Sequence, residues 1–321
     1  MQDAFFKATQ NALSSLTSLT DIIHPITVSM WNTRAQVIGT YAVIPNATPH
    51  QIAAKYGLGS GIHGVNYKRV FKETPWDRHE ESIAWLFLNS IIPIYEGWLE
   101  TLNSDVFTSA NGNISVESMQ FPKPRSKGNA IDELTRLTLT ESSIIKDAFY
   151  VKYSSRKYRC LSQLNNLLIC YRYFKQMRNC YMHNNMIADS ALLNVYRNFA
   201  NLLNPSDLNM TEIPKHFPPI ANSQVHLSLR GVIGFFHVVL QILVTCDAEL
   251  SRSVFSEKEM LDRLSKIITT PITINGSKER AFRQIDGIFK SAGFISPNHS
   301  SMNLLIPFLI DNRFIYPVVI K

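Results

Sequence analysis

The segment LSQLNNLLICYRYFKQMRNCYMH, residues 161–183, carries the clearest structural signal in the chain. Its large apolar side chains recur every three or four residues, which is the spacing of one face of an α-helix. This stripe consists of Leu161, Leu164, Leu168, Tyr171 and Phe174. We therefore predict a helix that packs along the stripe and holds the polar residues at its carboxyl end in a fixed position.

Helical patterns also precede and follow this segment. The sequence Thr74-Pro75-Trp76-Asp77 predicts a helix start, because the threonine can cap, the proline fits the first turn and the aspartate can complete a capping box. An apolar face then extends to Leu102, with Pro93 as the expected position of a kink. Further helices are predicted at residues 132–187, 191–203 and 227–250. We expect a mainly α protein with four or five long helices between residues 74 and 250.

The two ends of the chain are less regular. Residues 1–73 form a basic amino-terminal region in which residues 51–60 resemble the first helix and turn of a helix-turn-helix motif. Glycines 59, 61 and 64 occupy the place of the expected recognition helix, so we interpret this segment as an ordinary helix with a glycine-rich exit. Residues 251–321 combine helical patterns with a strand-like closing stretch, which predicts a small α+β segment.

The charge distribution points to an acidic partner. The net charge is +7, and no Asp or Glu occurs between Ala148 and Ala188 or between Ile22 and Lys72. A positive electrostatic field attracts polyanions. Nucleic acid is favoured over an anionic membrane surface because no basic amphipathic anchor is evident in the sequence. A loop at residues 121–128 is basic as well. The cations that we expect to bind RNA are Lys152, Arg156, Lys157, Arg159, Arg172 and Lys175.

Composition also bears on compartment and cofactors. The amino terminus lacks the order of a signal peptide, and the longest apolar run, residues 231–246, is shorter than the ~20 residues that span a bilayer. The four cysteines match neither a metal-ligand pair nor a disulfide framework. The histidines do not cluster at metal-ligand spacing, and no glycine-rich phosphate loop occurs. We expect a cytoplasmic protein with no membrane association, no cofactor and no metal site.

Three groups with phosphodiester chemistry lie together at the carboxyl end of the 161–183 segment. Asn179 and His183 share one helix face, and Arg178 lies about 140° from His183, within reach of its long side chain. An imidazole titrates near neutral pH, and a guanidinium binds phosphate through two parallel hydrogen bonds. Groups of these kinds can cleave a phosphodiester bond, although a His on a helix is more often a packed or surface residue than a catalyst.

The string of residues 173–185 resembles the signature of the HEPN superfamily, in which an Arg is followed by four to six residues and then a His. An Asn often follows the Arg in that family, as Asn179 does here. Residues 184–189 also resemble the tail of bacterial HEPN proteins from defence and toxin loci. The resemblance implies a HEPN-like helical bundle over residues 74–250. It also implies a metal-independent endoribonuclease, in which the ribose 2′-OH attacks the adjacent phosphorus and leaves a cyclic phosphate and a 5′-OH.

The resemblance assigns a role to each motif residue. His183 would act as general acid or base, Arg178 would stabilise charge on the phosphoryl oxygens, and Asn179 would orient the imidazole or bind phosphate. One motif supplies too few groups alone, so the resemblance implies a homodimer that pairs two His183 helices. The implied setting is a toxin or antiviral effector, with an antitoxin or regulatory protein as a further partner.

Other interpretations stay open. Arg230 and His237 also satisfy the looser Arg-x(4–6)-His spacing, but they lie in an apolar run, and we expect His237 to be a hydrogen-bonded core residue. One alternative function is a nucleic-acid-binding regulator that uses residues 22–72 on DNA and performs no chemistry. The other is a HEPN scaffold that binds a nucleotide or a protein without cleavage.

Overall fold

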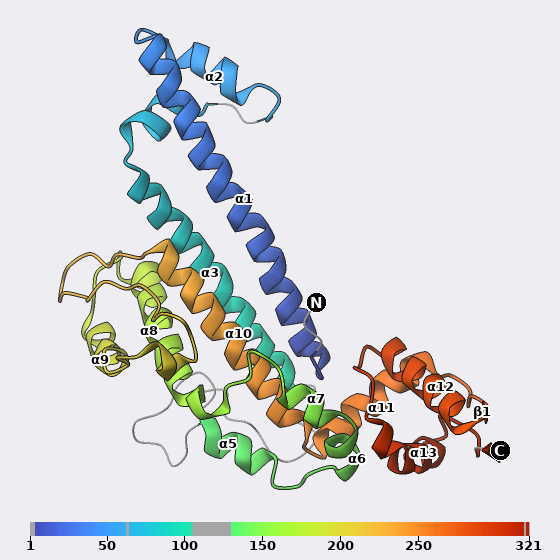
Figure 1. Ribbon diagram of the computed structural model, residues 1–321. Helices are drawn as coiled ribbons and strands as arrows, with labels where there is room; N and C mark the ends of the chain where they lie inside the picture. The colour runs from blue at the N-terminus through green and yellow to red at the C-terminus, as the bar shows by residue number, and fades with distance from the viewer. Residues whose placement is uncertain (1–3, 62–63, 105–129, 318, 321) are drawn as a thin grey trace.

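The computed structural model describes residues 4–61, 64–104, 130–317 and 319–320, and the chain is mainly helical (Figure 1). The mainly α fold class is therefore confirmed. The loop predicted at residues 121–128 lies outside the described residues.

Three helices form the centre of the molecule. They are α3 (Trp76–Leu102), α8 (Leu164–His183) and α10 (Leu229–Ser251). Phe174 of α8 stacks on Phe235 of α10, with ring centroids 4.7 Å apart, and Tyr171 lies 4.5 Å from Tyr95 of α3. The predicted stripe of α8 is buried from Leu164 onward. Leu161 lies before α8, in a 3-10 turn at Leu161–Gln163, and is half-buried.

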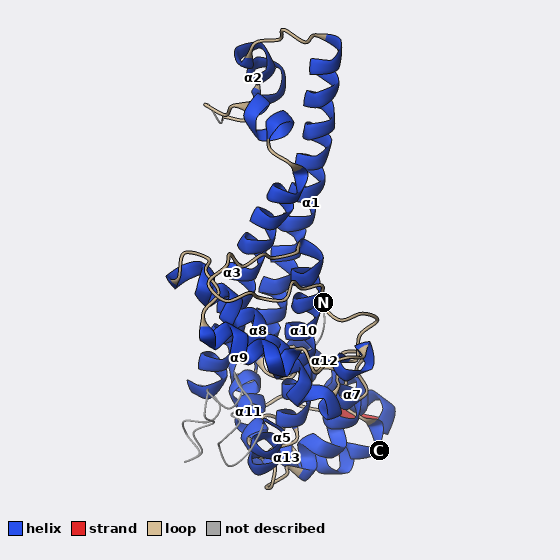
Figure 2. Cartoon of the chain, turned by 90° about the vertical axis from the view of Figure 1, so that its left-hand side faces the viewer, coloured by secondary structure: helices blue, strands red, loops and turns tan. Residues whose placement is uncertain are grey.

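The amino-terminal region contributes a core helix that its sequence did not clearly indicate. Helix α1 (Lys7–Val43) is continuous through Pro25. Its first half packs on α3, where Trp98 Nε1 donates to Thr9 Oγ1 at 2.9 Å. Its second half projects with the start of α3 as a two-helix arm (Figure 2).

A small second hydrophobic cluster lies at the end of this arm. Helix α2 (Pro49–Gly57) and a π-helical turn at Lys68–Glu73 fold back on α1 around the side chains of Val37, Tyr41, Ile52 and Phe71. No helix follows the turn after α2 directly within the described residues, and Gly59, Gly61 and Gly64 have positive φ angles. Positive φ favours glycine, so the glycines make an exit turn and leave no recognition helix. The interpretation of an ordinary helix with a glycine-rich exit is confirmed.

The predicted cap of α3 is wrong, although the helix start is right. Pro75 occupies the N-cap position and no side chain caps the helix there. Thr74 Oγ1 instead donates to the carbonyl oxygen of Arg69 at 2.9 Å. Arg34 of α1 donates to the carbonyls of Phe71 and Thr74, both at 2.7 Å. This tertiary contact and the preceding π-turn fix the entry into α3 in place of a capping box.

The helical pattern predicted for residues 132–187 is broken into several pieces. They are α5 (Ala130–Leu137), α6 (Ser143–Ile145), a π-turn (Lys146–Tyr150), α7 (Val151–Ser154) and then α8. Ser142 starts α6 by accepting the backbone N–H of Ile145 at 3.1 Å. Helix α9 (Ser190–Phe199) follows α8, and a 3-10 turn lies at Pro205–Leu208.

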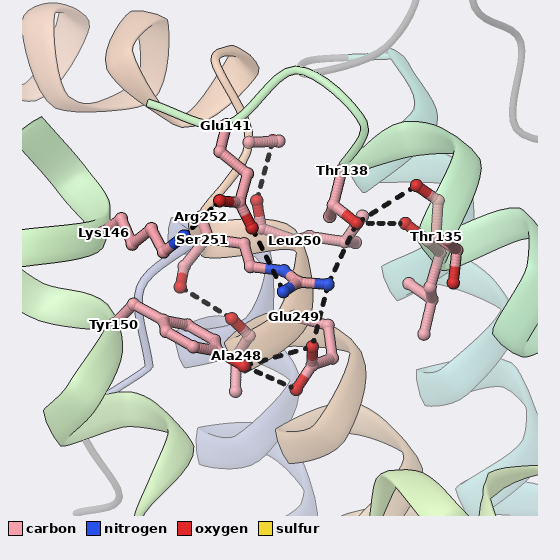
Figure 3. Close-up of polar contacts among 12 residues, drawn as sticks. Thr135, Thr138, Glu141, Lys146, Tyr150, Ala248, Glu249, Leu250, Ser251 and Arg252 are labelled. Atoms are coloured by element: carbon pink, nitrogen blue, oxygen red, sulfur yellow. Dashed lines mark hydrogen bonds and ion pairs between the residues drawn. The ribbon is translucent and has the colours of Figure 1, made fainter. Parts of the chain in front are cut away.

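A polar cluster attaches these short pieces to the end of α10 (Figure 3). Glu249 is 1% exposed and accepts from Tyr150 Oη, while Arg252 contacts both Glu249 at 3.6 Å and Glu141 at 3.2 Å. Lys146 pairs with the same Glu141. Because a buried carboxylate is costly unless it is paired, this cluster fixes the 138–150 segment on the bundle.

The carboxyl-terminal segment is a small helical unit with one strand pairing. It contains α11 (Phe255–Ile267), α12 (Lys278–Ser291), a 3-10 turn (His299–Ser301) and α13 (Met302–Asp311). Asn275–Gly276 form β1, which pairs in parallel with β2 (Val319–Ile320). Phe289 and Phe294 contact Phe149, so residues 1–73, 74–250 and 251–321 share one core cluster.

Helix α10 is also apolar enough to be tested as a membrane span. Among the described helices it has the length and hydropathy that crossing a bilayer requires, and 67% of its most apolar window is buried inside the molecule. A core helix of a soluble protein passes the same test.

Candidate active site

The Arg178–His183 motif forms the last turn and a half of α8, and its residues differ in burial. Cys180 is buried, Arg178 and Asn179 are half-buried, and His183 is exposed as the final residue of the helix. The apolar stripe of α8 positions all of them because it is anchored on α3 and α10. Arg178 and His183 lie on different faces of α8, which is what their separation of about 140° around the helix predicts.

Arg178 faces α3. Lys175, three residues earlier, pairs with Glu96 at 2.5 Å, and Tyr181, three residues later, stacks on Trp85 at 4.6 Å. Arg178 Nε is buried and has no hydrogen-bond partner among the described residues, and the same is true of Asn89 Oδ1 in α3. Each of these polar atoms is costly to leave unpaired.

Asn179 does not orient the imidazole of His183 as the sequence analysis expected. Its Oδ1 accepts from Arg178 Nη1 and its Nδ2 donates to Gln176 Oε1, both at 3.5 Å. These distances are at the upper limit of hydrogen bonding. Within the described part of the chain, the His183 imidazole has no hydrogen-bond partner. Asn179 therefore belongs with the guanidinium, and the imidazole is free to turn toward solvent.

Asp189 links the end of α8 to α9, and the sequence analysis did not identify it. One carboxylate oxygen accepts from Asn184 at 2.8 Å and from Gln176 at 3.5 Å. The other accepts from the backbone N–H of Leu192 at 2.7 Å and so caps α9. An Asp immediately before an apolar helical pattern is the signal that could have found it.

The turn that leaves α8 is held in an uncommon backbone conformation. Asn185 and Met186 have φ angles of 51° and 64°. The N–H of Met186 donates to the Cys180 carbonyl at 3.0 Å, and its carbonyl accepts from Val225 at 2.7 Å. Positive φ is unusual for Met, so these tertiary contacts stabilise a strained turn directly after His183.

A pocket of about 590 Å³ lies between the start of α3 and this turn. The aromatic pair Trp85 and Tyr181 forms part of its wall, and Arg78 and Glu81 contribute charge. Glu81 is held by Arg78 at 3.4 Å and by His226 at 3.0 Å. Other lining residues are Asn89, Met186 and Gln224. The pocket offers stacking and hydrogen-bonding groups beside the motif.

The six cations expected to bind RNA do not form one surface. Arg159 pairs with buried Glu249 at 2.6 Å, and Lys175 pairs with Glu96. Burial lowers the pKa of Arg172, which is half-buried. Lys152, Arg156 and Lys157 precede α8, whose 20 residues separate them from His183 by about 30 Å. Carboxylates from α3 and α10 thus neutralise part of a segment that has no acidic residue of its own.

The second Arg and His pair is arranged differently. Arg230 forms an exposed ion pair with Glu212. His237 is half-buried, and burial, followed by the nearby charge of Lys157, lowers its pKa. Its ring contacts Phe236 and has no hydrogen-bond partner among the described residues. The expectation of a hydrogen-bonded core histidine is therefore wrong, because this face of α10 is only partly covered.

No group of three His, Cys, Asp or Glu side chains in the described ranges is placed to hold a metal ion. All four cysteines are buried and unpaired. Comparison with protein-family models, with curated proteins and with solved structures found no match to this chain. The resemblance to the HEPN superfamily therefore rests on the sequence pattern of residues 173–189.

Proposed function

We propose that this protein is a metal-independent endoribonuclease of the HEPN type, acting as a toxin or antiviral effector. The observation that carries the proposal is the end of α8. A buried helix presents His183 to solvent five residues after a half-buried guanidinium whose Nε lacks a partner among the described residues. Buried unpaired donors are uncommon unless a ligand or a rearrangement satisfies them.

The chemistry follows from these two groups. An exposed imidazole can accept the proton of a ribose 2′-OH as its oxygen attacks the adjacent phosphorus. The 5′-oxygen then leaves and requires a proton, which a second imidazole supplies. Arg178, held beside Asn179, stabilises the negative charge on the phosphoryl oxygens. The products are a 2′,3′-cyclic phosphate and a 5′-OH.

The need for a second imidazole supports a two-fold dimer. His183 and its neighbours Met182, Asn184 and Asn185 are all exposed, so the end of α8 is open to a partner. A two-fold axis beside this end would place two His183 side chains across one phosphodiester. The pocket beside this end is lined in part by Tyr181, whose half-buried ring we expect to contact an RNA base.

The first test is cleavage of total RNA in EDTA. We expect activity to persist and to produce cyclic-phosphate ends, because neither step uses a metal ion. His183→Ala should abolish cleavage and change the melting temperature only slightly, since the side chain is exposed and leaves no cavity. His237→Ala is the matched control, with cleavage retained and a larger loss of stability because that ring is half-buried. Activity that disappears in EDTA and returns with Mg²⁺ would contradict the mechanism.

A folded, RNA-binding protein without cleavage would instead favour the scaffold or the regulator. Mapping of the residues that contact nucleic acid then distinguishes these two functions, because a regulator that binds DNA would use residues 22–72.

A further inference from the structure

A second pocket lies at the opposite end of α8 from His183. Its volume is about 620 Å³, and it is lined by Lys152 of α7, by Arg156, by Lys290 of α12 and by residues 293–296. Segments more than 130 residues apart in sequence thus bring three cations to one concave surface. No part of the proposed active site lies here.

The three cations are held in place by contacts that leave donors available. Lys152 Nζ donates to the carbonyls of Ser296 at 2.8 Å and of Pro297 at 3.5 Å, which leaves one of its three N–H groups available. The Arg156 guanidinium lies over the Tyr153 ring at 4.5 Å and has no ion-pair partner in the described part of the chain. Stacking fixes the plane of the guanidinium and leaves its N–H groups free for a bidentate acceptor.

The local charge at the pocket is positive. Lys290 pairs with Asp286 at 2.8 Å, and Lys152 also lowers the pKa of that carboxyl. Burial raises the pKa of the Asp247 carboxyl in the core to about 6, and the positive charge of Arg156 acts in the opposite direction and lowers this pKa. Even with both carboxyls ionised, three cations exceed two anions.

The carbonyls at the end of α12 do not repel an anion from this pocket, because they already accept hydrogen bonds. The N–H groups of Ala292, Gly293 and Phe294 donate to them. Arg263 donates to the Ala292 carbonyl through Nε at 2.8 Å and through Nη2 at 2.6 Å. The negative end of the helix dipole is therefore compensated.

We propose that this pocket binds a phosphomonoester, through Arg156 and Lys290 with Lys152 as a third donor. A phosphomonoester carries a charge of about −1.5 to −2 at neutral pH, whereas a backbone phosphodiester carries one. Three convergent cations therefore favour a terminal phosphate over the interior of an RNA chain. The ligand is either the 5′-phosphate end of RNA or a free nucleotide.

Binding of 2′-O-methyl oligonucleotides to the full chain tests the proposal. These oligonucleotides lack the 2′-OH nucleophile, so the measurement does not depend on the nuclease proposal. A 5′-phosphorylated oligonucleotide should bind at least about ten times more tightly than its 5′-hydroxyl counterpart, which corresponds to about 1.4 kcal/mol. Adenosine 5′-monophosphate and adenosine identify the source. If adenosine 5′-monophosphate competes with the phosphorylated oligonucleotide and adenosine does not, the ligand is a free nucleotide. If the monophosphate does not compete, the ligand is the 5′-phosphate end of RNA.

The double variant Arg156→Ala/Lys290→Ala should lose the preference for the 5′-phosphate. Arg283→Ala is the matched control, because it removes the same kind of charge from α12 two turns away, about 10 Å along the helix. It should keep the preference. Equal affinity of the two oligonucleotides for the wild type overturns the proposal. So does a preference that survives in the double variant, whose melting temperature verifies that it is folded.

Discussion

At the scale of single residues, Asp247 makes the stability of the core depend on pH. Its carboxylate lies in α10 and accepts the backbone N–H groups of Phe5 at 2.7 Å and Phe6 at 3.0 Å. Burial raises its pKa to about 6, against the opposing effect of these two hydrogen bonds. The folded state thus favours the protonated carboxyl more than the unfolded chain does.

The sign of the pH effect follows from this shift. Between pH 4 and 6 the folded state binds the proton that the unfolded state has released. The contribution of Asp247 to stability is therefore complete below pH 4 and is lost as the pH rises through 6, on the order of 3 kcal/mol. We expect the unfolding free energy of the wild type, relative to Asp247→Asn, to decrease over this interval in urea titrations. A relative increase would show that the two N–H donors outweigh desolvation.

At the scale of elements, the junction of α8 and α9 combines a helix cap with the motif. Asp189 caps α9 and at the same time holds Asn184 and Gln176 of the α8 end. Removal of a helix cap costs about 1 kcal/mol, and each lost hydrogen bond to a charged group adds to that cost.

We expect Asp189→Ala to lower the unfolding free energy by about 1–3 kcal/mol in denaturant titrations. Ser277→Ala is the control, because Ser277 caps α12 by accepting the N–H of Arg280 at 3.4 Å and does not link two helices as Asp189 does. It should cost less than Asp189→Ala. Equal losses would mean that the contacts to Asn184 and Gln176 contribute nothing beyond the cap.

At the scale of the whole molecule, the shape leaves the motif accessible. The far end of the arm, with α2, extends away from the body that contains α8 to α13 (Figures 1 and 2), whereas the start of α3 packs on the end of α8 through Trp85 and Tyr181. The His183 side chain is exposed beside this contact. An open α8 end is what a composite site across two copies requires.

Mixing two inactive proteins tests the composite site. His183→Ala and Arg178→Ala homodimers should each be inactive. After subunit exchange, the mixed dimer retains one wild-type His183 and one wild-type Arg178 on opposite chains. We expect only partial recovery of RNA cleavage in the mixture, measured beside each variant alone, because the one remaining imidazole accepts the 2′-OH proton while water must protonate the leaving 5′-oxygen. A wild-type protein that is monomeric at the assay concentration and fully active would refute the shared site.

The sequence by itself determined the helical class and the helices that carry strong apolar periodicity. The α8 stripe and the burial of α10 follow from local spacing, because a residue three or four positions away on a helix shares its face. The motif residues were also visible in sequence, since Arg178, Asn179 and His183 are a local pattern.

Tertiary structure decided the partners of those residues. Glu249 and Glu96 neutralise Arg159 and Lys175 from α10 and α3, and Asn179 turns toward Arg178 and Gln176 instead of His183. The same holds for α1, whose weak pattern becomes a core helix only against α3. Contacts between segments distant in sequence depend on packing of whole helices, which no local spacing encodes.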